Sequence, residues 1–173
     1  MTTRALPGDL MMWVLILSEL AVFAAGLTAF LAVRITDPLG FALAQDQLHR
    51  ASAGVNTVVL VTSGLLAALA LHAAQAGARR RCRAMLAGAA LLGVVFLVLK
   101  GMEYADTPSG DSAFFMFYYL LTGFHAAHVI AGVVILGLCA ITCRPAQVQA
   151  GAQFWHMVDL VWIVLFPIIY LLR

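Results

Sequence analysis

Apolar residues along this chain gather into five long stretches that are separated by short polar segments. The stretches cover residues of about 10–34, 54–76, 84–104, 113–139 and 153–172. A hydrocarbon core about 30 Å thick needs roughly 20 apolar residues per helix, and each stretch reaches that length. The strict alternation that is typical of membrane barrels is not seen. The pattern therefore predicts an all-α, polytopic membrane protein in which a single membrane domain forms a bundle of five transmembrane helices.

Turn-forming residues mark the ends of these stretches. They are Asp37-Pro38-Leu39-Gly40, Gly77-Ala78, Thr107-Pro108-Ser109-Gly110 and Arg144-Pro145. Because proline disfavours a helical conformation at the preceding residue, the first helix is expected to end at Asp37. Five spans use most of the chain, so the connecting loops are expected to be short.

Composition supports the same class of protein. Of the 173 residues, 64% are hydrophobic and 10% are charged, whereas a soluble domain typically has about 25% charged residues. A net charge of +2 gives no reason to expect a nucleic-acid partner. Cys82, Cys139 and Cys143 form no CxxC pattern, and we interpret them as structural residues rather than thiolate metal ligands.

The distribution of arginine predicts the orientation in the membrane. Basic residues accumulate on the cytoplasmic side of membrane proteins. With a cytoplasmic N-terminus, Arg4, Arg79, Arg80, Arg81, Arg83 and Arg144 would lie inside, and Arg34, Arg50 and Arg173 outside. The larger group favours an N-in, C-out orientation.

Ionisable residues at the depth of the hydrocarbon chains are costly, and each is a clue to function. Glu19 lies in the middle of the first stretch, and Phe23, Gly26 and Phe30 follow it on the same helix face. Three interpretations remain open: a hydrogen-bonded packing residue, a carboxyl that modulates proton movement in a partner, and a catalytic acid.

Two polar pairs occur in the second and third stretches. Asn56 and Ser63 are seven residues apart and share a face, which favours close helix packing with hydrogen bonds across it. Lys100 and Glu103 are three residues apart near the outer end of the third stretch. We expect an interfacial ion pair there, with a site for an external partner as the alternative.

Histidines follow in the last two stretches. His125 and His128 share one face of the fourth, and His156 and Asp159 share one face of the fifth. Three imidazoles and a carboxylate could bind zinc or iron. Because the Glu-x-x-His motifs of di-iron bundles are missing, we predict no metal site and expect these groups to hydrogen-bond the fourth span to the fifth.

Several of these residues fall in motifs of a known family. Residues 155–162, WHMVDLVW, resemble the W-H-x-V-D-x-V-W signature in the last helix of subunit III of haem–copper oxidases. Residues 122–129, TGFHAAHV, are similar to the T-G-x-H-x-x-H-V run of its penultimate helix. Ser18-Glu19, Asn56-Thr57, Ser63-Gly64 and Glu103-Tyr104 also follow in the family order.

The resemblance implies an accessory subunit without haem, copper or other cofactor, packed against the large catalytic subunit and binding phospholipid. It implies support for the stability or proton uptake of that subunit, with Glu19 on the side that faces it. The remaining polar residues would form the framework of the bundle: Asn56, Ser63, Glu103, His125, His128, His156 and Asp159. The expected location is a bacterial inner membrane.

The chain also departs from that family. The usual subunit III has seven helices and this sequence resembles the last five, as do short bacterial oxidase subunits and a nitric-oxide-reductase-associated protein. The opening Pro7-Gly8-Asp9-Leu10 looks like the latter type, and Lys100 stands where glutamine is more usual. Whether the partner reduces oxygen or nitric oxide stays open. The alternatives are a histidine-ligated electron-transfer protein and a small transporter lined by Lys100, Glu103 and Asp159.

Overall fold

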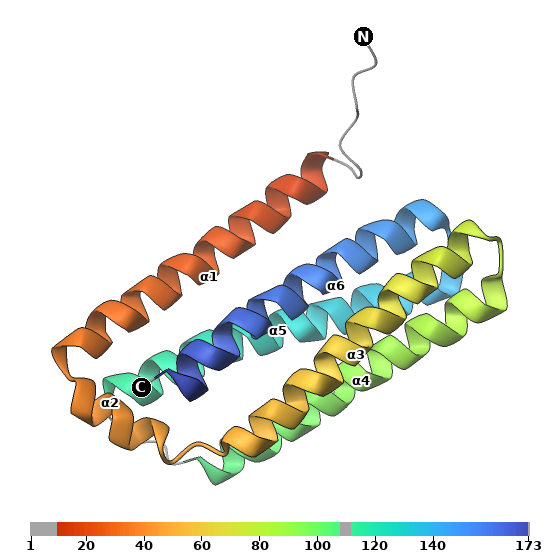
Figure 1. Cartoon of the computed structure of the whole chain (residues 1–173). Helices are drawn as coiled ribbons and strands as arrows, with labels where there is room; N and C mark the ends of the chain where they lie inside the picture. The colour runs from red at the N-terminus through yellow and green to blue at the C-terminus, as the bar shows by residue number, and fades with distance from the viewer. Residues whose placement is uncertain (1–9, 108–111, 173) are drawn as a thin grey trace.

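The computed structural model describes residues 10–107 and 112–172, and helices make up most of both parts. The elements are α1 (Leu10–Thr36), α2 (Pro38–Gln45), α3 (Arg50–Gln75), α4 (Arg79–Asp106), α5 (Ala113–Thr142), α6 (Pro145–Phe166) and the π-helical segment η1 (Pro167–Leu171). Figure 1 shows α3, α4, α5 and α6 running alongside one another, with α1 along the side formed by α5 and α6. Helices α1, α3, α4, α5 and α6 with η1 are each long and apolar enough to span a membrane, which confirms the all-α, five-span prediction.

Three helices begin earlier than the hydropathy pattern predicts. Helices α3, α4 and α6 start at Arg50, Arg79 and Pro145 rather than near 54, 84 and 153. Their first turns are polar, so a search for apolar residues misses them although the backbone is already helical. Pro145 suits the first turn of α6 because an N–H there has no partner within the helix.

Helix α2 was not expected from the sequence. Asp37 ends α1 as predicted, but its side chain then accepts a hydrogen bond from the Gly40 backbone N–H at 3.0 Å and caps a second helix. Pro38 occupies the first turn of that helix, and Phe41 packs on Phe30 of α1 with ring centroids 5.4 Å apart. Asp37 and Pro38 therefore form the turn between α1 and α2.

The indole of Trp155 joins four helices at the centre of the bundle. This α6 side chain is fully buried, and its Nε1 donates to Ser63 Oγ of α3 at 3.0 Å. Ser63 Oγ donates in turn to the Ala89 carbonyl of α4 at 2.7 Å. Gly93 of α4 and Gly132 of α5 lie against the ring, so a Cβ at either position would collide with it.

Arginines hold one end of the bundle together. Arg79 Nη2 and Arg83 Nε of α4 donate to the carbonyls of Thr142 and Ala140, each at 3.0 Å, in the last turn of α5. These carbonyls lack partners within their own helix and carry its negative dipole end, so cations stabilise them. The orientation stays a prediction. Arg4, Pro7-Gly8-Asp9, Pro108-Ser109-Gly110 and Arg173 lie outside the described residues.

The close approach at Trp155 yields a test of the fold. Gly132→Ala should lower the stability of the protein by about 1–3 kcal/mol because the added methyl overpacks the indole. Gly137→Ala on the same helix is the matched control, since a Cβ there meets nothing within 4 Å. The thermal unfolding midpoint in detergent measures both, and equal midpoints would contradict the packing described here.

Candidate functional site

Glu19 and His128 form a polar contact between α1 and α5. Glu19 Oε2 lies 3.1 Å from His128 Nε2, and their side chains are 28% and 15% exposed. The imidazole also packs against aromatic rings, with centroids 5.5 Å from Phe23 and 4.6 Å from Phe124. The structure therefore places an acid and a base together in a largely apolar, half-open setting.

The second nitrogen of His128 determines where protons can sit. His128 Nδ1 lies 2.8 Å from the Phe124 carbonyl oxygen, which can only accept a hydrogen bond. Nδ1 must therefore carry a hydrogen, and the contact with Glu19 needs one more proton on Nε2 or on the carboxyl. In both forms the pair is neutral overall, and it holds one exchangeable proton between the two side chains.

The face of α1 that carries Glu19 packs inside this chain. Phe23 and Phe30 are buried, and a Cβ at Gly26 would meet a Leu121 side-chain carbon of α5 at 2.7 Å. The apolar residues of this face therefore pack within the chain, and the expectation that Glu19 faces the catalytic subunit stays a prediction. The spacing identifies a face that packs closely, but it does not distinguish a helix of the same chain from one of another.

His125 is enclosed without a hydrogen bond. The side chain is fully buried on α5, and neither ring nitrogen has a partner among the described residues. Its imidazole stacks on Trp162 with centroids 5.1 Å apart and meets the edge of Phe96 at 5.6 Å. It therefore contacts α6 through an aromatic ring rather than through a polar bond.

The predicted hydrogen bonding between the fourth and fifth spans is wrong in its partners. His128 of α5 contacts Glu19 of α1, while His156 Nδ1 of α6 lies 3.6 Å from Asp159 Oδ2 on the same helix. The i,i+3 spacing favours a partner within one helix. It gives no information about which neighbouring helix a histidine reaches.

Asn56 and Ser63 lie buried on one face of α3, as their spacing predicts. Asn56 Nδ2 donates to the Phe96 carbonyl at 3.3 Å, and Ser63 Oγ bonds to Ala89, both on α4. Asn56 Oδ1 has no hydrogen-bond partner among the described residues. The two side chains thus fasten α3 to α4 at separate heights.

Lys100 and Glu103 form the expected ion pair, with Nζ and Oε2 3.2 Å apart. Both side chains are 2% exposed, so the pair is enclosed by the bundle, and its depth in the membrane stays a prediction. Tyr118 of α5 and Tyr170 of η1 cover them and donate to Glu103 Oε1 at 2.8 and 2.6 Å. These phenols take the place that water would have at a membrane surface.

The four side chains form a closed network. Lys100 Nζ donates to Glu103 Oε2 and to the hydroxyls of Tyr118 and Tyr170, so each of its three hydrogens has an acceptor. The ammonium also lies 4.7 Å from the ring centroid of Tyr118 and 5.4 Å from that of Trp162. This arrangement can hold charge within the bundle, and it connects α4, α5 and η1.

Sequence analysis missed both tyrosines of this network. Their hydroxyls lie on segments remote from Lys100 along the chain, and a tyrosine near a helix end is more often an interfacial anchor. The available signal was a charged pair, Lys100 and Glu103, within an apolar stretch, because a charged pair removed from water needs additional hydrogen-bond partners. No spacing rule identifies which residues supply them.

The structure bears on the alternative functions as well. Within residues 10–107 and 112–172, no three His, Cys, Asp or Glu side chains are arranged to hold a metal ion. Lys100 and Glu103, two of the three residues expected to line a transport path, are buried in the closed network. The geometry therefore favours neither a histidine-ligated metal protein nor a transporter.

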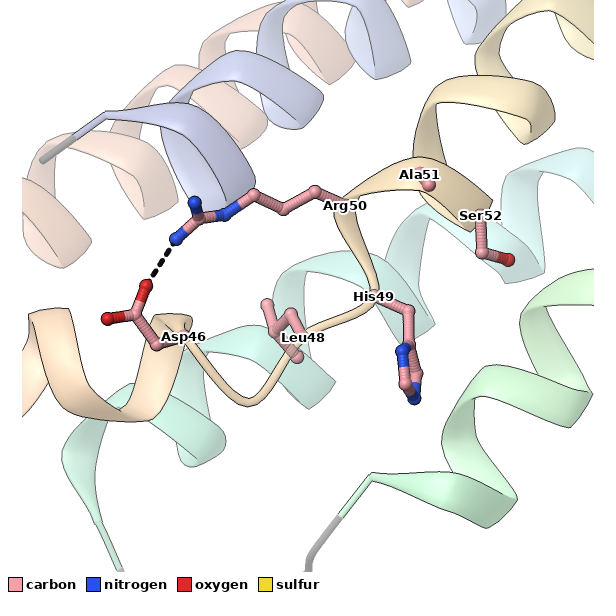
Figure 2. Close-up of a pocket in the computed structure, with 6 residues that line it drawn as sticks. All are labelled: Asp46, Leu48, His49, Arg50, Ala51 and Ser52. Carbon is pink, nitrogen blue, oxygen red and sulfur yellow. Dashed lines mark hydrogen bonds and ion pairs between the residues drawn. The ribbon is translucent and has the colours of Figure 1, made fainter.

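A polar hollow of about 660 Å³ lies where α2 leads into α3 (Figure 2). Its lining residues are Asp46, Leu48, His49, Arg50, Ala51 and Ser52. Arg50 Nη2 bonds to Asp46 Oδ1 at 2.5 Å, and His49 points away from this pair. No residue that the sequence singled out as a site residue lines the hollow, so it lies apart from the Glu19–His128 contact.

The closed network predicts an asymmetry between single and double substitutions. Glu103→Gln leaves the Lys100 ammonium without a buried counter-charge and should cost about 3–5 kcal/mol of stability. Adding Lys100→Met removes the stranded charge and should recover much of that loss. Unfolding midpoints of the single and double variants in detergent measure the coupling, and simple additivity would contradict the network.

Comparison with known proteins identifies the family of this chain. The family model described as cytochrome c oxidase subunit III matches residues 6–173. The chain is 38% identical over 126 residues to cytochrome c oxidase subunit 3 of Triticum aestivum, 37% over 126 to that of Arabidopsis thaliana and 35% over 126 to that of Paracentrotus lividus. These alignments cover 67% of this chain and 48% of each relative, so the chain spans about half the length of the curated relatives it matches. The chain belongs to the cytochrome c oxidase subunit III family.

Proposed function

We propose that this chain is a non-catalytic accessory subunit of a haem–copper respiratory enzyme, bound to the catalytic subunit within the membrane. The observation that carries the proposal is the family match over residues 6–173. The catalytic subunit supplies the redox chemistry, and this chain supplies packing surface and polar groups at membrane depth. Co-purification in mild detergent with a haem-containing subunit tests the proposal, and a chain that purifies alone from its native membrane would contradict it.

The Glu19–His128 contact is our candidate for an influence on proton uptake. It holds one exchangeable proton in an electrically neutral pair, and Glu19 is open enough to exchange it. A neutral pair avoids the cost of an isolated charge in hydrocarbon. We propose that this proton buffers the entry to the proton path of the partner, and that no step of the redox reaction occurs on this chain.

Phospholipid is the second proposed ligand. An apolar groove of about 220 Å³ runs between α1 and α6. It is lined by Leu20, Phe23, Ala24, Leu27, Leu160, Val161 and Val164. These side chains offer no polar partner, so the part of a lipid that fits the groove is an acyl chain, with the headgroup at a membrane surface.

The location and the substrate of the complex are also proposals. We propose a bacterial inner membrane as the location, and the resemblance to short family members supports this. Both oxygen and nitric oxide are compatible with a haem–copper partner, and a gas-consumption assay of the purified complex distinguishes them.

The proton proposal predicts the behaviour of variants at the pair. Glu19→Gln should leave assembly intact. It should slow proton uptake, or shorten the active lifetime of the complex during turnover, several-fold because the amide cannot release a proton. His128→Ala should have a similar effect, and the double variant should add little because the two residues act as a unit. Ser18→Ala, an exposed change on the same helix, is the control. Wild-type proton uptake and lifetime in Glu19→Gln would refute this role.

The lipid proposal predicts a loss of bound phospholipid. Ala24→Trp fills the groove between α1 and α6 and should displace the acyl chain, whereas Ala29→Trp adds the same ring to an exposed part of α1. Phosphorus per chain, or native mass spectrometry of the complex, measures retained lipid. Equal lipid in the two variants would count against the groove as the binding site.

A further inference from the structure

Arginines gather at the end of the bundle where α4 and α6 begin, and Figure 1 shows the α3–α4 and α5–α6 connections side by side at this end. Four of them lie in the first two turns of α4 and one directly precedes α6: Arg79, Arg80, Arg81, Arg83 and Arg144. Two contacts bring these segments together. Arg79 Nη2 donates to the Thr142 carbonyl, and Cys143 Sγ lies 3.7 Å from the Arg79 carbonyl oxygen. The five residues therefore share one region of the surface, which we name the arginine patch.

Three cations of the arginine patch are not used within the chain. Arg79 and Arg83 donate to the carbonyls at the end of α5. Arg80, Arg81 and Arg144 are exposed, and none of them has a hydrogen bond or ion pair among the described residues. These three guanidinium groups can therefore bind a ligand without breaking a contact of the fold.

The chain supplies no negative charge to the arginine patch. Residues 10–18, 72–102 and 112–158 contain no aspartate or glutamate. The first turns of α4 and α6 hold no acidic residue, although anions stabilise the positive end of a helix dipole and cations oppose it. The arginines thus repel one another and the helix ends beside them. An anion from outside the chain would relieve this repulsion.

An apolar groove of about 310 Å³ lies next to the arginine patch, where α5 leads into α6. Its lining residues are Ile135, Leu138, Cys139, Ile141, Thr142 and Gln147. Leu138 and Ile141 are 60% and 69% exposed, so the groove is open to the surroundings of the bundle. Thr142 Oγ1 donates to Gln147 Oε1 at 2.6 Å and forms the polar end of the groove, two residues before Arg144. The groove therefore offers apolar walls that end beside cations.

The position of the arginine patch along the helices indicates which anion it meets. The third apolar stretch begins near residue 84 and the fourth ends near residue 139, so the patch lies where the hydrocarbon core is expected to end. Lipid phosphates fill that layer, and basic clusters directly beside a spanning helix attract anionic lipids. Guanidinium groups bind phosphate through parallel hydrogen bonds.

Two simpler explanations account for only part of this arrangement. The insertion rule requires the arginines to lie on one side of the membrane, but it does not require an apolar groove beside them. An acidic segment of another subunit would neutralise the charges but leave the groove unfilled. A phospholipid with a net negative charge carries the anion and the apolar chain in one molecule.

We propose that the arginine patch and the adjoining groove form a binding site for an anionic phospholipid. Its phosphate lies among Arg80, Arg81 and Arg144, and an acyl chain lies along Leu138 and Ile141. The site is separate from the groove between α1 and α6, and it selects the charge of the headgroup. It does not depend on the accessory-subunit function. With the N-in orientation that the sequence predicts, the lipid belongs to the cytoplasmic leaflet.

The lipid selectivity of the wild-type protein tests the site without any substitution. The full chain, with the subunits it retains, is reconstituted in vesicles of phosphatidylcholine and phosphatidylglycerol in equal amounts and then extracted in mild detergent. Native mass spectrometry should find several-fold more phosphatidylglycerol retained, and salt should reduce the excess because it screens exposed charges. Equal retention of the two lipids, or an excess that inorganic phosphate alone displaces, would overturn the proposal.

Substitutions test the contribution of the arginines. Arg80→Gln, Arg81→Gln and Arg144→Gln should each weaken phosphatidylglycerol binding roughly fivefold, the contribution of one arginine beside an anionic membrane surface. Arg144→Lys keeps the charge and should bind nearly as the wild type does. Arg50→Gln is the control, because it removes an arginine that is already paired with Asp46. A triple glutamine variant that retains wild-type amounts of phosphatidylglycerol would contradict the site.

Two further measurements test the acyl chain and the nature of the occupant. Leu138→Trp narrows the groove and should reduce retained phosphatidylglycerol, whereas Leu120→Trp adds the same ring at another exposed position of α5. Equal retention in these two variants would remove the groove from the site. A benzophenone amino acid in place of Arg81 should give adducts with lipid in the intact complex. Adducts with an acidic segment of another subunit instead would overturn the proposal.

The outcomes separate this inference from the proposed function. If the chain purifies without a haem-containing subunit but still selects phosphatidylglycerol, the accessory-subunit proposal fails and the lipid site stands. If Ala24→Trp loses phosphatidylglycerol while the triple glutamine variant retains it, the groove between α1 and α6 binds the lipid and the arginine patch does not.

Discussion

A polar group at the depth of the lipid tails must find its partner in protein, because the hydrocarbon core supplies no water. The Lys100–Glu103 cluster shows how completely this chain can pair a buried charge: Glu103 and two tyrosines from other segments together accept every hydrogen of the ammonium. The requirement also determines packing. The ring nitrogen of Trp155 bonds to Ser63 of α3, while glycines on α4 and α5 let these two helices approach the same indole.

The same requirement separates groups that serve the fold from groups that serve other purposes. Ser63 and Lys100 have their partners within the chain, and both lie in the interior. Asp159 has one buried oxygen without a hydrogen-bond partner among the described residues, while Glu19 shares a proton with His128 at a half-open position. Family membership alone does not identify these two places, since the polar residues of the motifs include both kinds. Their difference lies in exposure and in which hydrogen bonds are already made.

Much of the fold follows from the sequence, because hydropathy directly reports which segments can lie in hydrocarbon. The polar first turns of α3 and α6 were not predicted, because these helices begin before their apolar stretches do. Helix α2 is too short to show a helical period. The site was harder to predict. Spacing shows that His125 and His128 share a helix face, yet one stacks on Trp162 and the other meets Glu19. Partner choice depends on how the helices are rotated about their axes, which no single segment encodes.

The arginines at the start of α4 have a consequence for how this protein could change over time. Arg79 and Arg83 belong to the arginines from which the sequence predicts the orientation in the membrane, and they also donate hydrogen bonds to the carbonyls at the end of α5. Relocating these charges to reverse the topology would therefore loosen a helix end as well. The direction of insertion and the stability of the bundle would depend on the same two side chains. A change in these arginines during evolution would therefore affect both properties together.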